Sequence, residues 1–154
     1  MPPKKQRGGA PVEGLQFPQT ARLTVKFGAV EATGQALQLA TVQEKPVVQW
    51  SPPPTETYIT FIVFDPNATA KSWIHWLVVN CERDGPMSGE EILEWAPPAP
   101  PAGTGLHTYY FATFSHQYPI HVDDVKERGY FNIGEFVKKY VIQPLSLVSF
   151  RAKK

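Results

Sequence analysis

Four polar side chains that could together form an anion site lie in or beside apolar runs of the sequence. Asp65 ends one such run, His75 lies inside the next, and His107 and Tyr109 share one face of a third. Because burying a charge or an unpaired imidazole is costly, we expect these groups to be satisfied by one another or by a ligand. A carboxylate that faces two imidazoles favours their protonated forms, and such a cluster suits a phosphate or carboxylate guest. The alternative is that each histidine only hydrogen-bonds a backbone carbonyl inside the core.

Other kinds of site have less support in the sequence. No GxSxG turn is present to expose a nucleophilic serine, and the spacing of Asp65, His75 and His107 matches no metal motif. The tryptophan side chains are typical of a core or a pocket wall rather than of a nucleic-acid stacking platform. We therefore expect a binding site without catalysis, metal or cofactor. A hydrolase that uses His75 and Asp65 has the least support.

Alternating apolar and β-branched residues predict strands around these side chains. Residues 58–64 and 73–79 predict two buried strands, joined by a turn that begins at Asp65, Pro66 and Asn67 because proline cannot donate to a ladder. Further strands are expected over residues 23–27, 36–42, 47–50, 92–95, 106–114 and 145–151.

The second of the two central strands embeds a histidine among core-like neighbours. Counting with a period of two places His75 on the same face as Trp73, Leu77 and Val79. The sequence therefore predicts that all four side chains face the same layer of the protein.

One short helix is predicted near the end of the chain. Asn132 is an N-cap residue with Glu135 three positions later, and apolar residues at helical spacing follow over 136–141. Pro144 is expected to stop this helix. The elements together predict a mainly all-β fold with one or two short peripheral helices.

The composition predicts one domain over residues 12–154, preceded by a disordered basic arm over residues 1–11. Basic residues gather at both ends and leave the body mildly acidic, so nucleic acid is expected to bind at most through those ends. Cys81 is the only cysteine, which favours a reducing compartment, and no apolar run is long enough for a membrane span. We expect a cytoplasmic protein, with the nucleus and mitochondria as alternatives.

Three segments, in this order, resemble the phosphatidylethanolamine-binding protein family, which includes the Raf kinase inhibitor proteins. They are FDPNATAKSWIHWLVVN (64–80), PPAGTGLHTYYF (100–111) and RGYFNIGEFVKKY (128–140). The resemblance implies an all-β domain with a large central antiparallel sheet, a smaller second sheet and a few peripheral helices. It also implies a small pocket for phosphate-like anions or phospholipid headgroups, without established catalysis. The pocket residues that it implies are Asp65, Pro66, Asn67, Trp73, His75, Pro100, His107 and Tyr109.

The sequence departs from the family pattern in and around this pocket. Asn67 stands where the family usually has a second aspartate, Thr69 replaces a proline, and Thr108 replaces the arginine that follows the histidine. Pro97 and Ala99 stand where glycines are common, and proline supplies no amide donor. The sequence also lacks the C-terminal helix that often overhangs the pocket. We therefore expect an open pocket with fewer anion donors.

Two functions are consistent with these features. The favoured one is a non-enzymatic module that binds a phosphate-like anion or a phospholipid headgroup and regulates a protein partner such as a kinase. The alternative is a structural subunit of a larger nucleoprotein or multi-protein assembly, which the weakened pocket, the missing C-terminal helix and the basic ends would suit.

Overall fold

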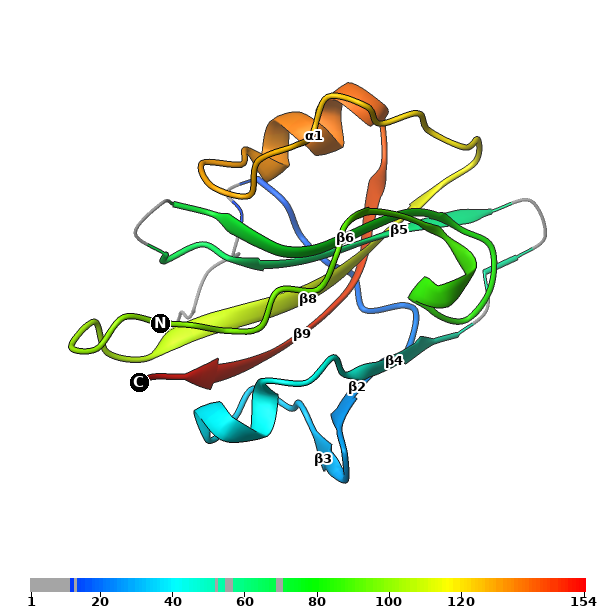
Figure 1. Cartoon of the computed structure of the whole chain (residues 1–154). Helices are drawn as coiled ribbons and strands as arrows, with labels where there is room; N and C mark the ends of the chain where they lie inside the picture. Colours follow the sequence, from blue (N-terminus) through cyan, green and yellow to red (C-terminus); the bar gives the residue numbers. More distant parts are fainter. Residues whose placement is uncertain (1–11, 13, 52, 55–56, 69–70) are drawn as a thin grey trace, which may run out of the picture.

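The computed structural model describes residues 12, 14–51, 53–54, 57–68 and 71–154, and the predicted arm over residues 1–11 lies outside them. The described chain is mainly β, as predicted, with a five-stranded sheet in the order β7-β6-β5-β8-β9 and a three-stranded sheet in the order β3-β2-β4 (Figure 1). All pairings within both sheets are antiparallel. The elements are β2 Leu23–Phe27, β3 Val30–Glu31, η1 Leu39–Val42, β4 Val47–Trp50, β5 Tyr58–Asp65, β6 Trp73–Cys81, η2 Pro86–Ser88, β7 Glu90–Leu93, β8 His107–His116, α1 Ile133–Tyr140 and β9 Gln143–Ala152.

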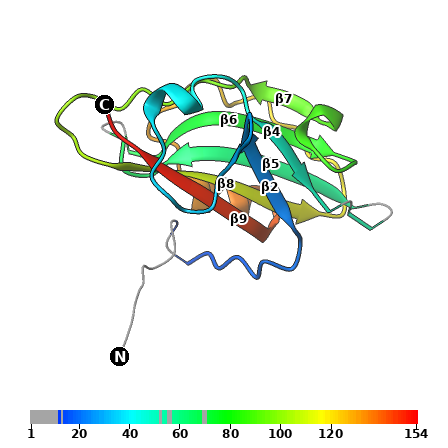
Figure 2. The ribbon, with the colours of Figure 1, turned by 90° about the horizontal axis from the view of Figure 1, so that it is seen from below.

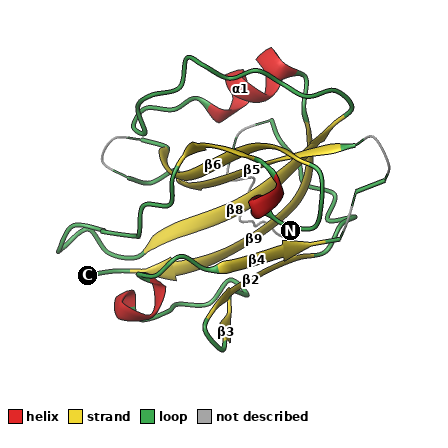
Figure 3. Ribbon diagram, turned by 45° about the vertical axis from the view of Figure 1, so that its right-hand side comes forward, coloured by secondary structure: helices red, strands yellow, loops and turns green. Residues whose placement is uncertain are grey.

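The large sheet is apolar on both faces because both faces are covered. On one face, Val25 and Trp50 of the smaller sheet pack in a single cluster with Phe61 of β5. Figure 2 shows β2 and β4 lying across the large sheet on this side. On the other face, Ile133 and Phe136 of α1 pack in one cluster with Ile62 of β5. Figure 3 shows α1 lying over this face of the sheet. Each such aliphatic or aromatic side chain contributes about 1.5–3 kcal/mol by leaving water, so the three layers stabilise one another.

The predicted helix is confirmed as α1. The Asn132 side chain accepts a hydrogen bond from the backbone N–H of Glu135 at 2.9 Å, which satisfies one of the free amides of the first turn. The helix ends at Tyr140, where Val141 adopts a left-handed conformation with φ of 54°. Pro144 does not end the helix, since it already lies in β9. At eight residues α1 is short, and no helix of the described residues has the length and apolarity to cross a bilayer.

The prediction of a strand over residues 36–42 is wrong. Only Ala36 pairs in this stretch, through an isolated bridge to Arg151, and the chain then turns into the 3₁₀ helix η1. Leu39 and Val42 lie three residues apart, and one turn of 3₁₀ helix brings both against the core that contains Val25 and Phe27. The apolar residues are therefore buried without a strand. The other predicted strands are present, and β7 begins two residues earlier than the predicted 92–95.

Candidate ligand-binding pocket

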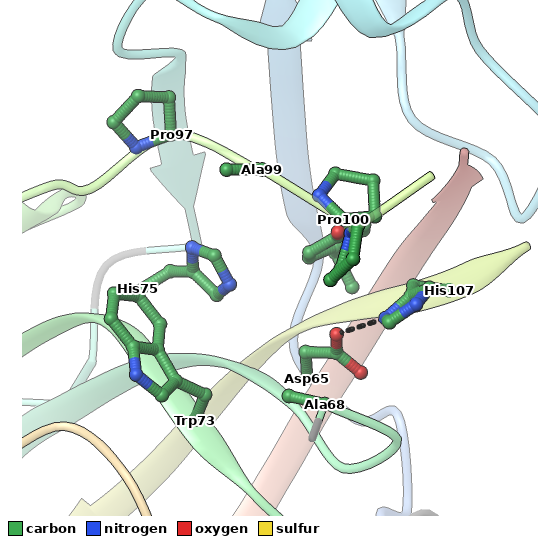
Figure 4. Close-up of a pocket in the computed structure, with 10 residues that line it drawn as sticks. Asp65, Ala68, Trp73, His75, Pro97, Ala99, Pro100 and His107 are labelled. Atoms are coloured by element: carbon green, nitrogen blue, oxygen red, sulfur yellow. Dashed lines mark hydrogen bonds and ion pairs between the residues drawn. The ribbon is translucent and has the colours of Figure 1, made fainter. Parts of the chain in front are cut away.

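A cavity of about 240 Å³ lies where one end of β5, β6 and β8 meets the proline-rich segment that precedes β8. It contains most of the residues predicted for the site, although Asn67 and Pro66 do not line it. Figure 4 shows the side chains converging from the strands and from the proline segment above them. The lining residues are Asp65, Ala68, Trp73, His75, Pro97, Ala99, Pro100, Pro101, His107 and Tyr109.

Asp65 and His107 form a buried ion pair at the base of the cavity. The His107 Nδ1 atom lies 2.7 Å from Asp65 Oδ2, and both side chains are at most 5% exposed (Figure 4). The other carboxylate oxygen accepts the backbone N–H of Asn67 at 2.8 Å. Asn67 therefore contributes through its backbone, in an Asx turn that holds the carboxylate, rather than as a second acid. Pro66 shapes the same turn directly after β5.

Thr104 completes this network, and the sequence prediction missed it. Its hydroxyl donates to the carbonyl of Pro101 at 2.7 Å, and the same oxygen lies 2.8 Å from His107 Nε2. A carboxylate oxygen only accepts, so Nδ1 of His107 carries the hydrogen that it shares with Asp65, and the Thr104 hydroxyl caps the other ring nitrogen. The three-residue spacing from Thr104 to His107 was a visible signal, but only the fold shows that their side chains meet.

His75 reaches the cavity through a β-bulge in β6. Val63 pairs with Trp76 while the next residue of β5, Phe64, pairs with Ile74, so His75 is an extra residue without an opposite partner. Such a bulge reverses the alternation of side chains beyond it. The prediction that His75, Leu77 and Val79 share a face is therefore wrong, because Leu77 and Val79 pack in the cluster beneath α1. The His75 ring instead contacts Tyr109, with the ring centres 5.2 Å apart.

The tautomer of His75 follows from its backbone partner. Nδ1 lies 2.7 Å from the carbonyl of Ala96, which accepts only, so Nδ1 carries the hydrogen. Burial lowers the pKa of His75, and the charges of Arg128 and His107 add to that effect against the opposing influence of the Ala96 bond and Asp65. The ring is therefore neutral at pH 7, and Nε2 is a lone-pair acceptor that no described residue engages.

Tyr109 lines the cavity and packs its ring against both histidines, with ring centres 5.2 Å from His75 and 6.3 Å from His107. Its side chain is 2% exposed and stacks on Phe150 with ring centres 5.2 Å apart. Burial, reinforced by the nearby charge of Asp65, raises the pKa of Tyr109, so the group stays a neutral O–H donor. None of the hydrogen bonds formed among the described residues uses this hydroxyl.

The proline-rich wall offers the cavity few amide donors. Within residues 97–101 only Ala99 has a backbone N–H, since the other four residues are prolines. The wall is held in place by the side-chain amide of Gln43, which donates to the carbonyl of Pro98 at 2.9 Å. Beyond the wall, Gly103 and Gly105 adopt positive φ values of 81° and 77°, which turn the chain into β8. The cavity is thus walled by apolar atoms with a small number of polar groups at its base.

Residues 14–148 match the family described as phosphatidylethanolamine-binding protein. The chain therefore belongs to the phosphatidylethanolamine-binding protein family, as the three sequence segments indicated.

Solved structures share the fold across almost the entire chain. A phosphatidylethanolamine-binding protein from Plasmodium vivax superposes with a TM-score of 0.76 at 17% identity, covering 94% of this chain and 90% of that one. A phosphatidylethanolamine-binding protein from Plasmodium falciparum gives 0.73 at 18% identity, covering 93% and 89%. A carboxypeptidase Y inhibitor, solved in complex with its cognate proteinase, gives 0.77 at 19% identity, covering 90% and 85%. At these identities the similarity establishes the fold.

Proposed function

We propose that this protein is a non-enzymatic binding module whose cavity holds a phosphate-like anion or a phospholipid headgroup, and that the occupied module regulates a protein partner. The observation that carries the proposal is the unengaged pair of polar atoms, His75 Nε2 and the Tyr109 hydroxyl, above the closed Asp65–His107–Thr104 network. The polar atoms of this network bond one another, so a guest is bound by the two atoms that remain, His75 Nε2 and the Tyr109 hydroxyl.

The size of the cavity favours a headgroup over a lipid tail. Its volume of about 240 Å³ equals the space of roughly eight water molecules at about 30 Å³ each. A phosphate group with a short substituent occupies such a space, whereas acyl chains would have to remain outside. Trp73 and Pro100 on the lining give the substituent an apolar surface. Family membership supports the same class of ligand.

Binding of an anion in this cavity should involve one proton. Neutral His75 presents a lone pair to the guest, which repels a fully ionised phosphate oxygen. Either the ring takes up a proton at Nε2, or a phosphate monoester, whose second pKa is about 6, arrives with its own proton. In both cases the complex holds a hydrogen between Nε2 and a phosphate oxygen, and Tyr109 donates a second hydrogen bond.

The test is an NMR titration of the protein with inorganic phosphate, phosphorylethanolamine and short-chain phosphatidylethanolamine. We expect saturable shifts of the His75, Tyr109 and Trp73 side chains, and their loss in His75→Ala. His121→Ala is the matched control, because His121 is an exposed histidine with a side chain 86% accessible. Absence of any shift up to millimolar ligand would refute the proposal and favour the structural-subunit alternative, for which recovery of a defined assembly would then be sought.

The partner and the compartment belong to the same proposal. The carboxypeptidase Y inhibitor shows that a protein of this fold can act on a protein partner, and we extend that kind of role to this chain. We place the module in the cytoplasm, where its cysteine would stay reduced. Cys81 is buried and free, and burial raises the pKa of its thiol to about 12, so it is inert rather than redox-active. Fractionation of cells that express the tagged protein tests the location.

A further inference from the structure

Arg128 lies directly behind the cavity, outside the set of lining residues. It is half-buried in the loop before α1, and its Nη1 atom donates to the carbonyls of Ile74 and His75, each at 3.2 Å. Its Nη2 atom donates to the carbonyl of Glu94 at 2.8 Å. The guanidinium thus joins the bulge of β6 to the segment that leads into the proline-rich wall.

Two of these carbonyls, those of Ile74 and His75, lie at the bulge of β6. An extra residue in one strand interrupts the ladder and leaves backbone groups unpaired. A guanidinium presents several N–H donors in a rigid planar fork, so a single arginine can bond carbonyls on two segments at once. A lysine ammonium carries the same charge but lacks this fixed geometry. The position therefore requires the shape of arginine as well as its charge.

The contacts of Arg128 also connect to the His75 side chain and to the start of the proline-rich wall. The carbonyl of His75 also accepts the N–H of Ala96 at 2.7 Å, while the His75 ring donates to the carbonyl of Ala96. Arg128 bonds the same His75 carbonyl and so holds this double link between the bulge and the wall. Its guanidinium also lies 5.5 Å from the ring centre of Trp73, whose ring packs at 4.7 Å against His75.

We propose that Arg128 is a positioning residue of the cavity: its guanidinium fork fixes the β6 bulge, and thereby the direction and tautomer of His75, against the proline-rich wall. The ligand part of this inference rests on the proposed function, whereas the orientation of His75 does not. The groups that face His75 are Asp65 from β5, His107 and Tyr109 from β8 and Arg128 from the loop before α1. Of these, only Arg128 contacts the backbone of the bulge.

The test uses Arg128→Gln, Arg128→Lys and the control Lys126→Gln, which removes a positive charge from an exposed side chain two residues away. Folding should survive, because the backbone carbonyl of Arg128 still accepts the N–H of Ile74 at 2.8 Å in every variant. Two quantities are measured: the ring tautomer and titration of His75 in ¹⁵N-histidine spectra of the ligand-free protein, and the affinity for inorganic phosphate.

We expect both Arg128 variants to bind phosphate at least tenfold more weakly and to show a mixture of His75 tautomers, while Lys126→Gln stays within twofold of the parent protein. In Arg128→Gln alone, the pKa of His75 should also rise, because a neighbouring positive charge has been removed. Full restoration by Arg128→Lys would overturn the positioning role, as would unchanged tautomer and affinity in both variants. If the parent protein binds no phosphate, the proposed function fails, and the tautomer alone decides the role of Arg128.

Discussion

Replacing Asp65 by alanine should cost a large share of the stability of this fold. Asp65→Ala leaves the buried His107 ring without the carboxylate that it bonds, and removing one partner of a buried pair of this kind costs about 3–5 kcal/mol. The free energy of unfolding of small domains is about 5–15 kcal/mol. At roughly 2–4 °C per kcal/mol for a chain of this size, the melting temperature should fall by roughly 6–20 °C.

Asp65→Asn separates the loss of charge from the loss of hydrogen bonds. The side-chain amide can still accept the Asn67 N–H and donate to His107 Nδ1, if the ring carries its hydrogen on Nε2 and donates it to the Thr104 hydroxyl. The unfolding free energy should therefore fall by less than half as much as in Asp65→Ala.

Urea denaturation at pH 7 measures both variants, together with His107→Ala and the double variant Asp65→Ala/His107→Ala. The double variant should lose clearly less than the sum of the two single changes, because each single change leaves the other buried group without its partner. Purely additive losses, or an Asp65→Ala protein as stable as its parent, would refute the assignment of a buried ion pair.

Three further predictions concern the cavity and the packing. Phosphate affinity should fall, approaching tenfold per unit, once the pH is above both the lowered pKa of His75 and the second pKa of the phosphate, because the complex then holds a proton that neither free partner carries. Calorimetric titrations that give one affinity from pH 5.5 to 8 would contradict this. Val141→Gly should raise the unfolding free energy by about 1 kcal/mol, because the exposed, β-branched Val141 of the parent protein occupies a left-handed conformation that glycine adopts without strain. An unchanged urea midpoint would contradict this prediction. Gly89→Ala should lower the unfolding free energy by about 1–3 kcal/mol, because the added Cβ would lie 2.5 Å from the Cys81 sulfur and 2.6 Å from the carbonyl of Val79; thermal melts that superpose on those of the parent protein would exclude that contact.

Local sequence patterns were sufficient to predict most of the elements. Strands such as β5 and β8 consist of apolar and β-branched residues bounded by turn residues, and α1 carries its N-cap in Asn132. These signals depend on neighbours within a few positions, so they are readable without a partner strand. The lack of amide donors in the proline-rich wall is likewise a property of the residues themselves.

The tertiary structure decided what local patterns do not contain. The bulge at His75 exists only relative to the register of β5, so counting along β6 alone assigned Leu77 and Val79 to the wrong face. The stretch 36–42 alternates like a strand, yet it pairs with the edge strand β9 only at Ala36 and then forms a 3₁₀ turn.

The same distinction applies to the cavity. The sequence by itself determined which side chains are chemically able to form a site, because buried aspartate, histidine and tyrosine need partners wherever they lie. Only the fold determined who those partners are: His107 meets Asp65 across 42 residues of chain, and Arg128 meets the His75 backbone across 53. Hydrogen bonds of such separation depend on strand order and register, which one strand read alone does not specify.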